Sequence, residues 1–195
     1  SYTQYIAATG GTVATTGNFK IHTFTGDGTF AVTDGKGALA QADYLVIAGG
    51  GSGGAQGSGS GGGGAGGYRF SDGTASGCYT AGPSPLGASA LPINPGCYSI
   101  TVGGGGAASP TPGSNNGSNS IFSTITSAGG GGGSTKACAA GSGKDGGSGG
   151  GGVGGYGENP CGAAKGSGNT PPVSPPQGNN GGDGTPGASS QDAGG

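Results

Sequence analysis

Glycine is the residue that most restricts what this chain can fold into. It supplies 57 of the 195 residues and recurs in uninterrupted runs. These runs are 49–51, 61–64, 103–106, 129–133 and 149–152. Glycine lets two backbones approach closely, but it has no side chain to bury. Because hydrophobic residues make up only 29% of the chain, we do not expect an ordinary side-chain core along its whole length.

Three structures compete for these runs. Tracts of glycine and serine generally behave as flexible coil, so disorder is one alternative. Collagen requires glycine at every third position without lapses, and the stretch "GSGGAQGSGSGGGGAGG" breaks that frame. In the third structure, left-handed helices with three residues per turn pack side by side, and their backbone N–H and C=O groups pair between neighbouring helices. The segments between the runs are long enough for the chain to turn around, which favours such a bundle of polyglycine II helices.

The first 48 residues are instead typical of β-strands. Phe19, Ile21 and Thr23 fall on one face of a period-two alternation, and Gly26-Asp27-Gly28 separates two β-rich stretches, as in a hairpin. Further strands are expected in "DYLVIA", "CYSITV" and "SIFSTITS". No stretch has a helical period. We therefore predict a mostly β and irregular fold without α-helix, with a small antiparallel β unit over residues 1–48. A glycine-rich body of polyglycine II helices with protruding loops is expected over residues 49–195.

The four cysteines, Cys78, Cys97, Cys138 and Cys161, favour two disulfides. None of them lies in a C-x-x-C pair and the only histidine is His22, so no zinc site is expected. Sequence order favours the pairs Cys78–Cys97 and Cys138–Cys161, although three connectivities exist. Each bridge would close a loop of about 20 residues, worth roughly 3 kcal/mol in the chain-entropy model. Such bridges indicate an oxidising, extracellular setting, and four buried free thiols are the alternative.

One motif resembles a dinucleotide-binding turn, with glycines in the pattern G-x-G-x-x-G at Gly49, Gly51 and Gly54. In such a site the turn opens a helix whose N-terminus holds the pyrophosphate. The residues that follow, "AQGSGSGGGGAGG", cannot form that helix, because each glycine costs about 1 kcal/mol relative to alanine. No nucleotide cofactor is therefore expected.

Other chemistry also lacks support in the sequence. Charged residues are only 7% of the chain and the formal net charge is −2, so there is no basic surface for nucleic acid. The acidic residues are scattered, and His22 is expected to be an exposed strand residue rather than a catalytic base. No apolar stretch is long enough to insert into a membrane. We expect neither an enzyme nor a metal-binding protein.

Aromatic residues beside the glycine runs are candidates for ligand binding, since their rings stack on sugars. Arg69 is a further candidate, because its guanidinium could form a bidentate interaction with a carboxylate or phosphate. The candidates are Tyr68, Arg69, Phe70, Tyr79 and Tyr156. Tyr98 also flanks a run, and it is either a further contact or a core residue of its strand. The alternative for Tyr68, Arg69 and Tyr156 is that they only cover the edge of the glycine framework.

A succession of motifs carries a family resemblance. In order these are "NFKIHTFTGDGTFAVT", "DYLVIAGGGSGG", "GGGGAGGYR", "GCYSITVGGGGAA" and "GSNSIFSTITSAGGGGG". Together they resemble the glycine-rich domain found at the ends of tailed-phage tail fibres and in related virion proteins, over residues 11–155. In its alternation of glycine runs and variable segments, the chain is also similar to the polyglycine-sandwich tail-fibre adhesins of T-even-like phages.

The resemblance implies a non-enzymatic virion component, extracellular on the tail fibre and most often trimeric. Its variable loops would bind a host surface glycan or an outer-membrane protein. The corresponding segments here would be 71–96, 107–119, 134–145 and 157–178. The chain departs from the usual pattern in carrying cysteines inside these segments. A purely structural extracellular fibre or matrix protein, in which the glycine body is itself the function, is the alternative.

Overall fold

The computed structural model describes residues 6–17, 19–35, 40–55, 60–71, 73, 87–109, 114–135, 142–154 and 164–184. Over these ranges the chain forms short β-strands and irregular extended segments, and it contains no helix. The prediction of a mostly β and irregular fold without α-helix is confirmed.

The chain forms two compact units, each drawn from separate stretches of sequence. The first unit consists of Ser1–Val46, Arg69–Val102 and Ile121–Thr126. The second consists of the intervening stretches and the rest of the chain, namely Ile47–Tyr68, Gly103–Ser120 and Ser127–Gly195. The predicted boundary at residue 48 lies close to the first crossing, but the two later returns of the chain to the first unit were not predicted.

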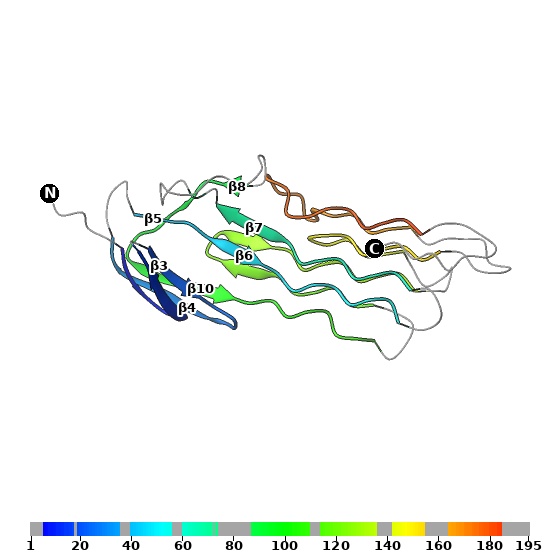
Figure 1. The fold of residues 1–195 in the computed structure, drawn as a ribbon, viewed down its shortest axis with the longest axis horizontal. Coiled ribbons are helices and arrows are strands. Elements are labelled where there is room, and N and C mark those ends of the chain that lie inside the picture. Colours follow the sequence, from blue (N-terminus) through cyan, green and yellow to red (C-terminus); the bar gives the residue numbers. More distant parts are fainter. Residues whose placement is uncertain are drawn as a thin grey trace. The chain divides into compact units, whose positions relative to one another are not determined.

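The largest sheet has the strand order β1–β4–β10–β11–β12 (Figure 1). These strands are β1 (Ala7–Thr9), β4 (Gly28–Asp34), β10 (Gly96–Thr101), β11 (Ser120–Phe122) and β12 (Ile125–Ser127). The pairs β1–β4, β4–β10 and β10–β11 are antiparallel. A strand from the middle of the sequence, β10, thus pairs with a strand near its start, which explains why the first unit is discontinuous.

The remaining strands form three smaller sheets. They are the hairpin of β2 (Thr12–Thr16) and β3 (Phe19–Thr23), the pair β5 (Gln41–Ala42) and β9 (Leu91–Pro92), and the sheet β6 (Leu45–Ile47), β7 (Tyr68–Ser71) and β8 (Gly87–Ala88). The hairpin and the β5–β9 pair are antiparallel, whereas β7 and β8 are parallel. "DYLVIA" and "CYSITV" therefore contribute strands, as predicted.

The side-chain core of the first unit is small and aromatic. Alternate residues of β4 face inward, so Phe30 and Val32 are buried together with Ile93. The Phe30 ring contacts Phe122 edge-on, with the ring centroids 5.9 Å apart. Tyr98 packs partly buried against this cluster, and its hydroxyl donates to the carbonyl of Asn94. Tyr98 is thus a core residue of its strand, which was one of its two predicted roles.

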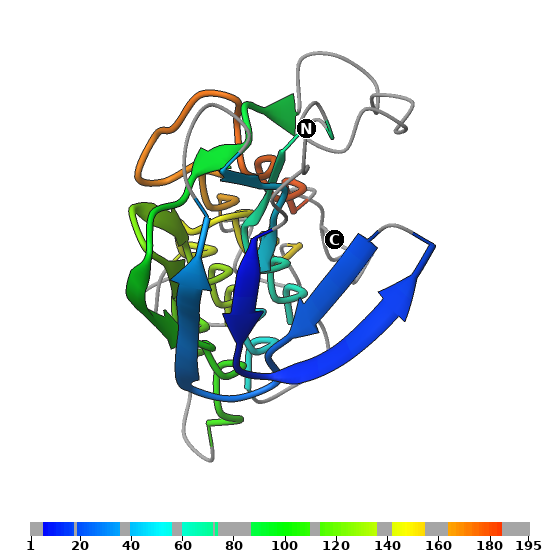
Figure 2. The same ribbon diagram turned by 90° about the vertical axis from the view of Figure 1, so that its left-hand side faces the viewer.

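His22 is more buried than expected. It lies in β3, which with β2 forms the two-stranded hairpin drawn in blue in Figure 2. Its Nδ1 donates a hydrogen bond of 2.8 Å to the carbonyl of Gly10, and its ring meets the Phe30 ring edge-on at 5.0 Å. The expectation of an exposed strand residue is therefore wrong for the side chain, because the imidazole covers one side of the aromatic core.

In the second unit, backbone hydrogen bonds join the glycine runs at three-residue intervals. In run 48–54, the N–H groups of residues 48, 51 and 54 donate to carbonyls of run 61–67, at 3.0, 2.9 and 3.0 Å. Residues 49 and 52 of the same run donate to run 114–119 instead, at 3.1 and 2.9 Å. A helix with three residues per turn points every third residue in the same direction. These bonds therefore follow the pattern of polyglycine II, and Figure 1 shows the runs extending side by side.

Run 128–135 is the most enclosed of these runs, and all of its residues are buried. It donates to runs 48–54 and 147–154 and accepts from run 61–67. A Cβ atom added at Gly131 would overlap the carbonyl of Lys144, far inside van der Waals contact. Glycine is required here by the close approach of a neighbouring backbone, which only a residue without a side chain permits.

Gln177 joins the polyglycine runs through a buried amide. Its side chain is 3% exposed, its Oε1 accepts from the N–H of Ala128 at 2.8 Å, and its Nε2 donates to the carbonyl of Pro171 at 2.9 Å. Its own carbonyl accepts from the N–H of Tyr68 at 2.9 Å. One glutamine thus bonds to three separate parts of the second unit.

Replacing Gly131 by alanine will destabilise the protein by about 3 kcal/mol, because a buried backbone must move to admit the methyl group. Gly104→Ala is the matched control, since a Cβ at Gly104 would meet no atom within 4 Å. Chemical denaturation of both variants measures the difference. Equal stability of the two variants would show that the packing of run 128–135 does not depend on glycine.

Gln177→Ala will cost about 3 kcal/mol, because it leaves a backbone N–H and a backbone C=O without their buried partner. The control is Asn180→Ala, which removes an exposed acceptor of the Gly168 N–H that water can replace. We expect a loss below about 1 kcal/mol for that variant. Thermal unfolding of the two proteins compares them, and similar losses would contradict a special role for the Gln177 amide.

Candidate functional site

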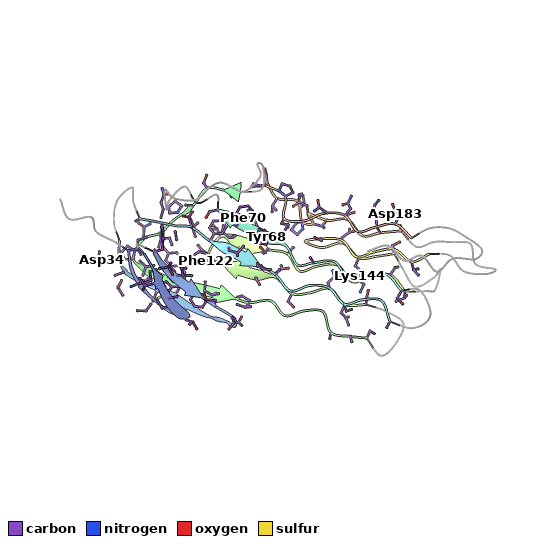
Figure 3. All side chains as sticks on the ribbon, in the orientation of Figure 1. Asp34, Tyr68, Phe70, Phe122, Lys144 and Asp183 are labelled. Carbon is purple, nitrogen blue, oxygen red and sulfur yellow. The ribbon has the colours of Figure 1, made fainter. Side chains whose placement is uncertain are left out.

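Tyr68, Arg69 and Phe70 lie on consecutive positions of β7 and do not form one cluster. Successive strand residues point to opposite faces, so Arg69 faces away from Tyr68 and Phe70. Tyr68 is 49% exposed, whereas Arg69 is half-buried and its Nη1 donates to the carbonyl of Thr126 at 3.3 Å. Figure 3 labels the two aromatic side chains. Arg69 therefore bonds to strand β12 of the first unit and not to a glycine run, while about half of the Tyr68 surface is exposed.

The cysteine predictions are largely untested by the structure. Tyr79, Tyr156, Cys78, Cys138 and Cys161 lie outside the described residues. Cys97 is a free, exposed cysteine at the second residue of β10. The predicted partner Cys78 lies outside the described residues, so the Cys78–Cys97 bridge stays a prediction, and no disulfide is seen among the described residues.

The hydrogen bonds between runs show that several runs of the second unit end at the same level along their common direction. Gly54 donates to the carbonyl of Gly61, Gly61 donates to Ser134, and Ser134 donates to Gly151, at 3.0, 3.0 and 2.9 Å. Gly152, the next residue, donates to Gly182 at 2.8 Å. We call this level of the second unit the loop end, because the chain leaves the described runs there on several sides.

The segments attached at the loop end overlap the predicted loops. They are 56–59, 110–113, 136–141 and 155–163, and the last described run also ends there at residue 184. These segments lie outside the described residues, but their attachment points are described. Three of the predicted loops therefore overlap segments that are attached at the loop end. These predicted loops are 107–119, 134–145 and 157–178. The remaining predicted segment, 71–96, is attached to β7 and β10 of the first unit.

Asparagine residues take part in the framework, which sequence reasoning missed. The Oδ1 atoms of Asn119 and Asn116 accept from the N–H groups of Gly129 and Gly132, at 2.9 and 3.0 Å. Side-chain oxygens of the neighbouring run 114–119 here take the place of backbone carbonyls. Ser114–Asn119 was predicted to be part of a loop, and it is instead a bonded run. The signal that could have found it is the three-residue spacing of Asn116 and Asn119.

The described charged side chains of the second unit lie on runs 143–146, 164–168 and 177–184. Lys165 Nζ forms an ion pair with Asp183 Oδ2 at 2.6 Å, and the Asp145 carboxylate accepts from the N–H of Ser167 at 2.6 Å. The Lys144 ammonium group donates to the carbonyl of Ser114. Figure 3 shows Lys144 and Asp183 on this unit. The hydrogen bonds from Lys165 hold the pKa of the Asp183 carboxyl below its ordinary value of 3.8.

Neither a metal site nor a membrane-spanning helix is found among the described residues. No group of three or more His, Cys, Asp or Glu side chains there could hold a metal ion. None of the described segments forms a helix that is long and apolar enough to cross a membrane. The chemistry that these parts of the chain offer is thus that of exposed polar groups, one ion pair and exposed aromatic and aliphatic side chains.

Comparison with known proteins assigns a family. The model of the glycine-rich domain family matches residues 23–195, and the chain belongs to that family. No curated protein and no solved structure matches the chain.

The ion pair predicts a pH dependence with a definite sign. Because the folded pKa of Asp183 is lowered, its stabilising effect is complete above the ordinary carboxyl pKa and is lost as the pH falls through the lowered value. The Lys165→Met variant will raise the pKa of Asp183, whereas Lys144→Met will leave it unchanged. Carboxyl carbon NMR titration measures both. An unchanged Asp183 titration in Lys165→Met would exclude the ion pair in solution.

Proposed function

We propose that this glycine-rich domain is a non-enzymatic adhesin at the distal end of a phage tail fibre. In this role it binds a glycan or an outer-membrane protein on the host surface. The domain would be extracellular on the virion and would be carried by a homotrimeric fibre. The proposal combines the motif resemblance over residues 11–155 with the arrangement of the loop end.

The observation that carries the proposal is the shared position of the run ends. Run 48–54 is antiparallel to run 61–67, because donors 48, 51 and 54 meet acceptors 67, 64 and 61. Run 128–135 is antiparallel to residues 144–147, since donors 144 and 147 meet acceptors 132 and 129. Alternating directions bring the intervening segments to one end, where several different sequences can contact one ligand. This arrangement suits recognition, because a rigid scaffold reduces the cost of ordering the loops on binding.

The glycine runs and the loop segments also differ in which side chains they can accommodate. Many framework glycines cannot accept a Cβ atom, as at Gly61, Gly64, Gly130 and Gly133. Segments 110–113, 136–141 and 155–163 contain Pro, Thr, Lys, Cys, Tyr and Glu, side chains too large for those close-packed glycine positions. The chemical variety needed for receptor recognition is thus concentrated where the framework does not restrict it.

Loop replacement tests this function. Segments 136–141 and 155–163 are each replaced by Gly/Ser sequences of equal length, and binding of the full chain to a panel of bacterial cells is measured. We expect each replacement to remove binding to the cells that the unaltered chain recognises. The matched control replaces residues 36–39 of the first unit and keeps binding. Binding that survives both loop replacements, or an unaltered chain that binds no cell of the panel, contradicts the proposal.

A further inference from the structure

The hairpin of β2 and β3 is a sheet of only two strands. None of the other described strands pairs with either of its edges. All five residues of β2 are exposed, and in β3 only His22 is half-buried. An isolated two-stranded hairpin is at best marginally stable in water, and a third strand or a packed face is what normally stabilises it. The hairpin therefore has room for a further strand.

The two edges of the hairpin differ in what holds them and what protects them. His22 fixes β3 to the core, since its Nδ1 donates to the carbonyl of Gly10 and its ring meets Phe30 edge-on. β3 also carries Lys20, and a lysine on an edge strand hinders pairing with another chain. β2 has the sequence TVATT, with neither a charged residue nor a proline, and Figure 2 shows it on the outer side of β3. The edge of β2 is therefore the unprotected one.

The register of the hairpin determines which backbone groups of β2 face outward. A two-residue turn joins Thr16 to its partner Phe19, and Gly17 in that turn has a φ of 58°, as a type I′ turn requires. The residues that flank such a turn exchange backbone hydrogen bonds, and bonded and non-bonded pairs alternate from there along the strands. Val13 and Thr15 fall at non-bonded positions, so their N–H and C=O groups point away from β3. These groups have no partner among the described residues.

We propose that β2 pairs with β2 of a second copy of the chain, antiparallel about a twofold axis at Ala14. In this register Val13 of each copy lies opposite Thr15 of the other, and each such pair exchanges two backbone hydrogen bonds. Both positions offer a donor and an acceptor, so the edge is complementary to itself, as a twofold interface requires. The product is one four-stranded sheet in the order β3–β2–β2–β3, which gives the hairpin the further strands that it lacks.

The side chains of the joined sheet fit this pairing. The two Ala14 residues meet at the axis, and Ile21 lies beside each of them on the same face. Ile21 and Phe19, which are 49% and 41% exposed, then belong to one continuous apolar face. Lys20 stands on the outer strands, so its two copies are separated by at least three strand spacings, about 14 Å. That distance exceeds the screening length of about 10 Å at 0.1 M salt, and the contact brings no like charges together.

The contact is small and belongs to the weak class of interfaces. We therefore expect association that depends on concentration and that strengthens when several copies are held together. Its twofold axis differs from the threefold axis of the proposed fibre, and it uses only residues of the first unit. The inference is thus independent of receptor binding at the loop end.

A charge exchange at Ala14 tests the contact in the full chain by sedimentation velocity, from micromolar to millimolar concentration. The unaltered chain will associate. Ala14→Lys and Ala14→Glu will each weaken self-association tenfold or more, because like charges then lie directly opposite each other across the axis. An equimolar mixture of the two variants will associate again, since an ammonium group then faces a carboxylate. Ala14 is exposed, so the unfolding temperature of each variant will stay close to that of the unaltered chain.

The matched control is Ile21→Lys, which places the same charge in the same row of the sheet but on β3, and it will retain self-association. Amide hydrogen exchange adds a second measurement, in which Val13 and Thr15 become protected as concentration rises while Ala14, already bonded to β3, does not change.

Three results overturn the proposal. They are a chain that stays monomeric at millimolar concentration, self-association that both Ala14 variants retain, and a mixture that fails to associate. The first of these would mean that the edge of β2 serves a different partner. None of these measurements involves host cells, so failure here is distinct from failure of the adhesin proposal.

Discussion

The backbone hydrogen bond between neighbouring glycine runs is the interaction on which the second unit depends. Each such bond contributes only about 1 kcal/mol net, and ordering a glycine backbone costs more entropy than ordering any other. The unit therefore needs many bonds acting together, and run 128–135 shows how this is achieved. All three of its donor rows are used, two by other runs and one by asparagine side chains.

The fold could be predicted from sequence wherever a local period or the absence of side chains determined the structure. The alternation around Phe19 and Ile21 predicted β3, and the glycine runs predicted backbone packing. Pairing between distant segments could not be predicted. The antiparallel pairing of β4 with β10 depends on contacts far apart in sequence, and no local pattern encodes it. The run Ser114–Asn119 was missed because its asparagines act as backbone substitutes, a role that composition does not reveal.

The candidate site was predicted less completely, for a related reason. Tyr68, Arg69 and Phe70 are adjacent in sequence, but a strand separates adjacent side chains onto opposite faces, and Arg69 is engaged with Thr126. Conversely, Gly54, Gly61, Ser134 and Gly151 are scattered in sequence and meet at one level, because run direction alternates. In this chain, proximity follows from the register of the runs and not from distance along the sequence.

The threefold register also governs how such a sequence can change in length. One residue inserted within a run turns every later donor by about 120°, away from its acceptor and toward a different neighbour. Three inserted residues restore the phase and lengthen the helix by one turn of about 9 Å. A segment between runs carries no such phase, so it can grow or shrink by any number of residues. The length of a run can thus change only in steps of three residues, whereas the length of a segment between runs can change by any number.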